Sequence, residues 1–507
     1  MRRLLINTGT NYAVLAMRIG VTFILTPLYV KYLGVYNFGI WELVVATLGY
    51  TGLLDLGLGF SISRFIAKHK AEGDHHALLV VFNTVTAFLS SIGVVLALVT
   101  LGMAIWHPGM LAARSGPGQS YALFLAIIAV QVFITFPGIA AVSCLEGYQK
   151  YYVKNLLTFI DAVLVLTVTL SFISRVNALI LLASMSTFSL VWKYVAYLVL
   201  LGKDREFPLY FGRKYISGAK LRSLLGFGVK AFIQGVSNQI QSRSGIFIIG
   251  IFLGAASVPL FTVPSNLASY LGNITETGSM AFMPHFSALD AQGRRDEILP
   301  LYLFASKFLL AVIVLMSVGL LLLGPDFIAL WVGFRFRAAA TELLPYLVVA
   351  AIIAYLNPFG PRYLIALGRH GIYAKVAPIA LALNILVAVS LVRRAGMIGI
   401  VAGSIVAMLL VSITALRVCC RLLRISIATY LGRTLLPLIL PGLLMSAAVL
   451  TIRRFVPIQS IPEVFAIAVG GTVIYSVAFL VLGLSSSERA ELFHLFARGL
   501  SLQRGAG

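Results

Sequence analysis

Long runs of apolar residues recur along most of the chain, with short polar stretches between them. Runs of roughly 18 residues or more with few charges are typical of membrane-spanning α-helices. The sequence contains about fourteen such runs between residues 10 and 484. A transmembrane β-barrel is excluded, because barrel strands are about 10 residues long and alternate between apolar and polar positions. The pattern predicts an all-α integral membrane protein of about 14 transmembrane helices.

Composition supports this interpretation. Of the 507 residues, 60% are hydrophobic and 11% are charged, whereas soluble domains carry about 25% charged residues. A chain this apolar cannot cover itself with polar surface in water, so lipid must solvate most of it. The amino end, MRRLLINTGTNYAVLAMR, lacks a small-residue cleavage site, and we expect no cleaved signal peptide.

The formal net charge of +22 comes from 39 basic and 17 acidic residues. The basic residues gather in alternate loops, which is a topology signal rather than a nucleic-acid interface. By the positive-inside rule we expect both termini in the cytoplasm of a bacterial inner (plasma) membrane. The three cysteines have no metal-ligand spacing, so no metal or cofactor is expected.

A weak internal repeat divides the chain. The stretch YLGVYNFGIWELVVATLGYTG (32–52) aligns without gaps on FLGAASVPLFTVPSNLASYLG (252–272) at an offset of 220 residues. Gly34 then meets Gly254, and Gly73 in the following loop meets Gly293. An offset of six helices leaves the topology of the two halves parallel, as in many transporters. The alternative is chance similarity between apolar runs.

The repeat predicts four segments. Residues 1–202 form an N-terminal six-helix bundle and 203–223 a basic cytoplasmic linker. Residues 224–420 form a C-terminal six-helix bundle, and 421–507 add two transmembrane helices and a cytoplasmic tail.

Charged residues inside the apolar runs are costly in lipid, so they face cavities or partners. The intramembrane cations are Arg18, Lys193, Lys230, Arg243, Lys307, Arg362 and Lys375, and they outnumber the intramembrane carboxylates Asp55, Asp161 and Glu276. This excess predicts a cavity that receives an anion. For Lys193, Lys307 and Lys375, snorkelling to the headgroups is an equal alternative.

Polar residues also form stripes at helical spacing. Lys230, Gln234, Asn238 and Gln241 fall on one face of a predicted helix. The first helix carries a similar stripe that includes Asn11 and Arg18. Such stripes would be unfavourable against lipid and predict a water-filled cavity, although interhelical hydrogen bonds are an alternative.

Two further features concern single residues. Asp55 lies in an apolar stretch within reach of Arg18, and we expect it to orient Arg18 by an ion pair or through water; a backbone or serine partner is the alternative. Pro358 and Pro361 in NPFGP predict a helix break, after which Arg362 either satisfies the freed carbonyl groups or faces the pore.

The stretch LTPLYVKYLGVYNFGIWELVVATLGYTGLLDLGLGFSISRFIAKHKAEGD resembles the amino-terminal pattern of oligosaccharide flippases of the polysaccharide transporter group, the Wzx-type proteins. SGIFIIGIFLGAASVPLFTVPSNLASYLG (244–272) resembles the start of the second half of that family. These flippases belong to the MOP superfamily with the MATE multidrug exporters. The chain departs from the family pattern just before the IIG of the seventh helix, where Ser244 or Gly245 replaces an acidic residue.

The resemblance implies a MATE-like fold of two six-helix bundles around a cavity, with two extra helices. It also implies alternating access that moves a polyprenyl-diphosphate-linked oligosaccharide to the outer leaflet during polysaccharide synthesis, with the lipid bilayer as solvent and polysaccharide polymerase and export machinery as partners. The expected cavity residues are Arg18, Asn11, Asp55, Lys230, Gln234, Asn238, Gln241, Arg243 and Arg362. A MATE-type drug exporter is the alternative. A membrane glycosyltransferase or polymerase is a weaker one, and we expect no enzyme.

Overall fold

The computed structural model describes residues 2–51, 58–106, 121–203, 210–280, 282–367, 369 and 371–490. Within these segments, the side chains of residues 2–13, 15, 51, 60, 227–238, 241–242, 283–285, 291, 295 and 374 lie outside the description. The described chain is helical and contains no strand. It divides into two compact units, Met1–Pro259 and Leu260–Gly507.

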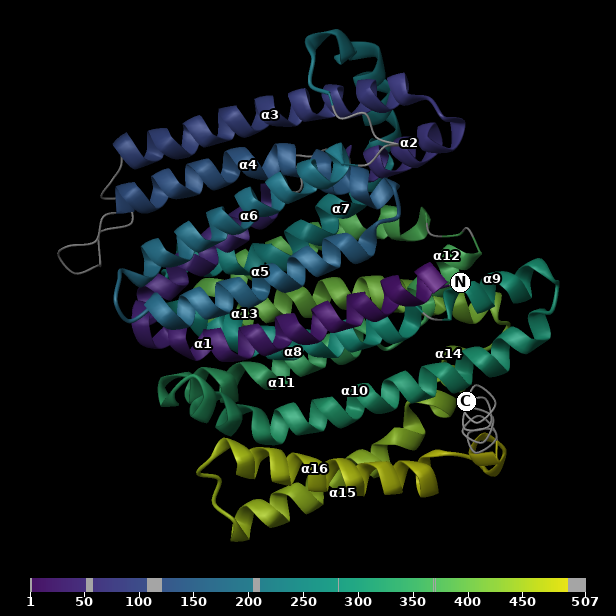
Figure 1. The fold of residues 1–507 in the computed structure, drawn as a ribbon. Helices are drawn as coiled ribbons and strands as arrows, with labels where there is room; N and C mark the ends of the chain where they lie inside the picture. The colour runs from purple at the N-terminus through teal and green to yellow at the C-terminus, as the bar shows by residue number, and fades with distance from the viewer. Residues whose placement is uncertain are drawn as a thin grey trace, which may run out of the picture. The chain divides into compact units, whose positions relative to one another are not determined.

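The first unit contains seven α-helices (Figure 1). They are α1 (Arg2–Thr51), α2 (Leu58–Glu72), α3 (His75–Trp106), α4 (Tyr121–Gly147), α5 (Tyr151–Phe172), α6 (Ala178–Gly202) and α7 (Gly218–Phe252). Helix α4 packs against α2, α3 and α6, whereas α1 packs against α5 and α7. Helix α7 belongs to the first compact unit, because it also packs against α2 and α3. The four-segment division stays a prediction.

The second unit contains α8 (Ser257–Met280), α9 (Met283–Ala291), α10 (Arg295–Trp331), α11 (Arg337–Ala354), α12 (Gly360–Ala366), α13 (Gly371–Leu422), α14 (Ile427–Thr434), α15 (Leu436–Phe455) and α16 (Ile461–Ala478). The unit boundary falls within the first residues of α8. Helix α10 is in contact with α11, α14, α15 and α16. A π-helical turn, η3 (Phe479–Gly483), extends α16.

Ten stretches of the described chain are helical, long and apolar enough to cross a membrane. Two of them, Ala16–Tyr50 and Gly371–Leu422, contain a bend at a non-helical glycine, so each covers two of the predicted spans. In α7, the described residues include a shorter apolar stretch, Arg243–Phe252. The all-α membrane fold is confirmed, while the count of about 14 stays a prediction.

Exposed aliphatic residues line the outer faces of these helices. On α16, Val469, Val473 and Val477 recur every fourth residue, and each is more than half exposed. A row of this kind faces lipid in a membrane protein, where the surrounding solvent is as apolar as the core.

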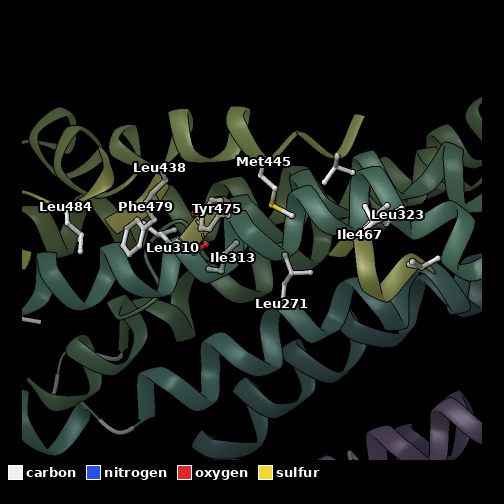
Figure 2. Packing of buried hydrophobic residues seen from close by; sticks show 13 residues of the cluster. Leu271, Leu310, Ile313, Leu323, Leu438, Met445, Ile467, Tyr475, Phe479 and Leu484 are labelled. Carbon is white, nitrogen blue, oxygen red and sulfur yellow. Dashed lines mark hydrogen bonds between the residues drawn. The ribbon is translucent and has the colours of Figure 1, made fainter. Parts of the chain in front are cut away.

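Several apolar cores lie between described helices of the second unit. Figure 2 shows one, in which Leu310 and Ile313 of α10 meet Leu271 of α8, Met445 of α15 and Tyr475 of α16. The Tyr475 hydroxyl donates a hydrogen bond of 2.9 Å to the Ala311 carbonyl. A polar tip with a partner lets the aromatic ring remain buried.

The basic linker before α7 is fastened to α3. The amide of Asn83 donates to the Tyr210 carbonyl at 2.8 Å and accepts from the Gly212 amide at 3.0 Å. The Thr84 hydroxyl bonds the Tyr215 carbonyl at 3.3 Å and the Ser217 amide at 3.0 Å. Asparagine and threonine on a buried helix face thus satisfy backbone groups that would otherwise lack partners.

The backbone supports the internal repeat. Gly34 and its repeat partner Gly254 both lie at positive φ, 70° and 85°. Gly73 and its partner Gly293 do the same, at 70° and 72°. Positive φ is a backbone conformation that glycine adopts readily and other residues rarely adopt. The aligned glycines therefore allow the same backbone conformation at equivalent positions of the two halves. Chance similarity of apolar runs would not predict this agreement.

Replacing Gly34 by alanine should destabilise the protein by about 1–3 kcal/mol, because the backbone at φ 70°, ψ 168° is essentially restricted to glycine. The matched control is Gly20→Ala, in the same helix and also with open space around the added methyl group. It should be neutral or slightly stabilising. Thermal unfolding in detergent measures both. Equal melting temperatures for the two variants would show that the bend does not depend on glycine.

Candidate functional site

Of the nine predicted cavity residues, the structure describes the side chains of three. Asp55, and the side chains of Asn11, Lys230, Gln234, Asn238 and Gln241, lie outside the described residues. Their contacts, including the Arg18–Asp55 pair, stay predictions. The backbone of α7 is helical throughout, so the α7 stripe does share one helix face. Arg18, Arg243 and Arg362 are described.

Arg18 lies on α1, inside the Ala16–Tyr50 span, with its side chain exposed. It is close enough to α6 to act electrostatically on Tyr197. Asp161 of α5 and Glu146 of α4 act on the same tyrosine. Four helices of the first unit therefore bring ionisable groups to one region.

Asp161 is the centre of a buried network in that region. One carboxylate oxygen accepts from the Lys193 ammonium at 2.6 Å, and the other accepts from the Trp192 indole at 2.9 Å. Asp161 is ten residues into α5, about 15 Å from its start and near the middle of a bilayer core. The sequence did not predict this ion pair, and the two roles expected for Lys193 stay predictions.

Arg243 is half-buried between α7 and α1. Its guanidinium lies beside Gly49, where an added methyl group would be 3.5 Å from the arginine Nε. It acts electrostatically on Glu42 and on Tyr50, both in α1. The neighbouring Gln239 donates to the Gly49 carbonyl at 3.0 Å. Small residues on α1 allow this close approach of α7.

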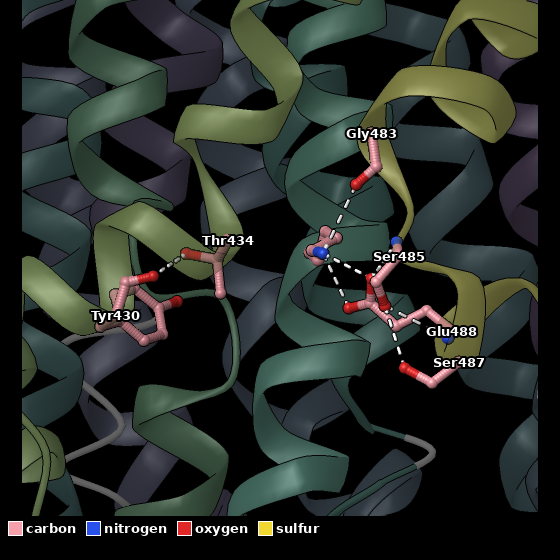
Figure 3. A network of polar contacts seen from close by, with 7 residues as sticks. Tyr430, Thr434, Gly483, Ser485, Ser487 and Glu488 are labelled. Atoms are coloured by element: carbon pink, nitrogen blue, oxygen red, sulfur yellow. Dashed lines mark hydrogen bonds and ion pairs between the residues drawn. The ribbon is translucent and has the colours of Figure 1, made fainter.

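Lys307 forms an ion pair, a contact that the sequence did not predict. Figure 3 shows the polar network at the end of the second unit, where both oxygens of Glu488 lie 2.7 Å from the Lys307 ammonium. Glu488 also accepts from the Ser485 amide at 2.8 Å, while the Ser485 hydroxyl accepts from the Glu488 amide at 3.3 Å. This reciprocal pattern is a capping box. Lys307 therefore fastens the segment after α16 to α10. Lys375, in contrast, is exposed.

A third ion cluster lies where α10, which continues to Trp331, is followed by α11, which begins at Arg337. Asp326 is buried within α10 and pairs with Arg337 of α11 and with Arg453 of α15, both at 2.5 Å. Arg453 also donates to the Leu322 carbonyl. The sequence did not predict this cluster, because hydropathy does not show which charges near helix ends are buried.

The predicted break at NPFGP is confirmed, because α11 ends at Ala354 and α12 begins at Gly360. Asn357 accepts a short hydrogen bond from Tyr302 of α10, and Tyr430 of α14 donates to the Leu356 carbonyl at 3.2 Å. The freed backbone thus finds a partner in Tyr430. Arg362 is half-buried on α12, and which of its two predicted roles holds stays open.

Two cavities are found in the second unit. One, of about 600 Å³, surrounds the Lys307–Glu488 pair and includes Arg433. The other, of about 630 Å³, lies where the ends of α12 and α13 meet the α9–α10 corner. It is lined by Arg369, Arg421 and Arg424. Arg424 has φ 55°, a conformation that costs a non-glycine residue about 1–2 kcal/mol.

Within the described part of the chain, no group of three or more His, Cys, Asp or Glu residues could hold a metal ion. The described ion pairs of Asp161, Asp326 and Glu488 join one helix or segment to another.

The family model of the polysaccharide biosynthesis proteins matches residues 6–290, more than half of the chain. The chain belongs to this family. A relative from Shigella flexneri named "Putative O-antigen transporter" is 22% identical over 371 residues, which cover 72% of this chain and 86% of the relative. The predicted membership in the polysaccharide transporter group is confirmed, and the family member is a multi-pass membrane protein.

Solved structures with the same fold are transporters. An inward-facing MATE family multidrug transporter of the MOP superfamily has a TM-score of 0.66 at 15% identity, covering 80% of this chain and 95% of its own. A eukaryotic MATE transporter has a TM-score of 0.56 at 15% identity, covering 86% and 98%. At these identities the likeness shows the fold alone, and the predicted MATE-like fold is confirmed.

Asp161→Asn should destabilise the first unit by about 2–3 kcal/mol, because it leaves the half-buried Lys193 ammonium without its counter-charge. The double variant Asp161→Leu with Lys193→Met removes both charges and should recover most of the lost stability. Heat-induced aggregation of the purified protein in detergent measures both variants. A double variant as unstable as the single one would rule out the unpaired charge as the cause.

The contact of Glu488 with Lys307 should be lost in acid. Burial alone would raise the pKa of Glu488, but the hydrogen bonds from Lys307 and the Ser485 amide outweigh burial and lower it. The stabilisation is therefore complete above the unfolded pKa of about 4.3 and disappears as the pH falls through the lower folded value. Hydrogen exchange of residues 485–490, corrected for intrinsic rates, should rise between pH 6 and pH 3.

The control for this pH effect is Glu488→Gln, which should exchange fast at both pH values because no carboxylate is present to titrate. Unchanged protection in the unmodified protein between pH 6 and pH 3 would contradict the assignment.

Proposed function

We propose that this protein is a flippase that moves a polyprenyl-diphosphate-linked oligosaccharide from the inner to the outer leaflet during O-antigen or exopolysaccharide synthesis. The observation that carries the proposal is an exposed cation, Arg18, inside a membrane-spanning helix of a member of the polysaccharide biosynthesis family. The relative from Shigella flexneri, by its name, supports transport of this class of glycan.

The cargo has three chemically different parts, and the first unit offers a partner for two of them, the diphosphate and the sugars. A diphosphate needs cationic donors, which Arg18 and Arg243 supply as planar guanidinium groups suited to bidentate contacts. Sugar hydroxyls need amides such as Gln234, Asn238 and Gln241 on the shared face of α7. The isoprenoid tail remains in lipid. No bond is made or broken, so the proposal needs no catalytic group and the protein is a transporter rather than an enzyme.

In the described part of the first unit, the charge pattern favours an anionic cargo over a cationic drug. A drug exporter of this fold would present unpaired carboxylates to its substrate. Here Asp161 is neutralised by Lys193, and Glu42 has Arg243 nearby. Arg18 is the exposed group of that region.

The location and the partners follow from the cargo. The lipid-linked substrate is made at the cytoplasmic leaflet, so the protein resides in the inner membrane with both termini in the cytoplasm. The flipped product is then used by polysaccharide polymerase and export machinery.

The test is complementation of a flippase-deficient strain, with surface polysaccharide and protein level measured together. Arg18→Ala should lower polysaccharide about tenfold or more at normal protein level, because a charge-assisted hydrogen bond to the diphosphate is lost. Arg18→Lys should retain part of the activity. The control Arg175→Ala changes an exposed arginine in the α5–α6 turn and should be silent.

Transport is also measured directly in proteoliposomes that contain the lipid-linked oligosaccharide. Equal translocation by the unmodified protein and Arg18→Ala would refute the role of Arg18. No translocation by any form of the protein would refute the flippase itself.

A further inference from the structure

We propose that the cavity of about 630 Å³ at the ends of α12 and α13 is a separate binding site for a phosphorylated polyol, with arginines holding the phosphate and aspartates holding the hydroxyl groups. This site lies wholly in the second unit. It goes beyond the proposed transport function, because a ligand can bind here whether or not the cargo is moved.

The cavity joins two helix ends to a corner. Arg369 follows α12, and Arg421 and Arg424 end α13, so guanidinium groups from two elements line one space. In the described part of the chain, none of the three guanidinium groups forms an ion pair with a carboxylate. Arginines converging on one cavity are suited to phosphate, which they bind through paired N–H groups.

The backbone of Arg424 has a conformation that is unusual for an arginine. The amide of Ile425 bonds the Cys420 carbonyl at 3.0 Å, and the amide of Arg424 bonds the Arg421 carbonyl at 3.3 Å, which closes the end of α13. The residue at positive φ in such a helix end is usually glycine. A cation near a helix carboxyl end is favourable anywhere in the last turn, so the helix dipole does not explain an arginine at the one strained position.

The side of the cavity opposite the arginines is the reason to propose a ligand that carries hydroxyl groups as well as a phosphate. Asp290 of α9 and Asp296 in the first turn of α10 line the same cavity. Carboxylates repel a bare phosphate but accept hydrogen bonds from hydroxyl groups. The volume exceeds that of phosphate alone and falls within the range of small-molecule sites. A phosphate joined to a hydroxyl-bearing group fits both walls.

Two sources offer this chemistry, a soluble sugar phosphate or a lipid headgroup such as phosphatidylglycerol. The experiment uses the purified full chain. The soluble probe is glucose 1-phosphate, with binding followed by calorimetry and thermal shift in detergent. The lipid probe is phosphatidylglycerol in nanodiscs, with phosphatidylcholine nanodiscs as the reference and native mass spectrometry as the readout.

The deciding variant is Arg424→Gly. It places glycine at a positive-φ position, so the protein should fold at least as stably as before. Affinity for the responding probe should nevertheless fall about tenfold, and more in combination with Arg369→Gln. The matched control is Arg417→Gln, an exposed arginine of α13 outside the cavity, which should bind normally.

Each outcome of these binding experiments either supports or overturns the proposed site. Binding of glucose 1-phosphate that Arg424→Gly weakens and Arg417→Gln does not supports a soluble ligand, and the same pattern with phosphatidylglycerol alone supports a lipid headgroup. Binding of neither probe overturns the proposal, as does an equal loss in Arg417→Gln, which would indicate non-specific charge. Arg18→Ala should bind normally here, so failure of transport and failure of this site are distinguishable.

Discussion

A charge in a chain solvated by lipid must find a partner within the protein, and this constraint determines how the helices are joined. Asp161, Asp326 and Glu488 each receive donors from at least two different positions. Breaking such a pair is costly because water cannot replace the missing partner. The three carboxylates therefore fix α5 to α6, α10 to α11 and α15, and the segment after α16 to α10.

The same constraint distinguishes functional charges from structural ones. Once Lys193 and Lys307 are assigned to ion pairs, the excess of intramembrane cations is smaller than the sequence suggests. Arg18 is exposed in its span, and an exposed cation in an apolar helix is unfavourable unless water or an anion meets it. The proposed function therefore depends on few residues.

The sequence was informative where one physical rule dominates. Hydropathy predicted the membrane helices, proline chemistry predicted the break at NPFGP, and aligned glycines predicted a repeat that the positive φ angles support. It failed where pairing depends on packing. Asp161 and Lys193 lie at comparable distances from the α5–α6 turn, a signal that could have predicted their contact. No comparable signal joins Lys307 to Glu488, which are far apart in sequence and on different helices.

The attachment of the linker to Asn83 and Thr84 has a mechanical consequence. A free polar tether would stretch or coil when its ends move, and it would transmit no force. Here the chain just before α7 is bonded to the side of α3 at several backbone positions. A rotation of α3 about its axis would therefore displace the first turn of α7 as well. The two helices are mechanically coupled through these hydrogen bonds.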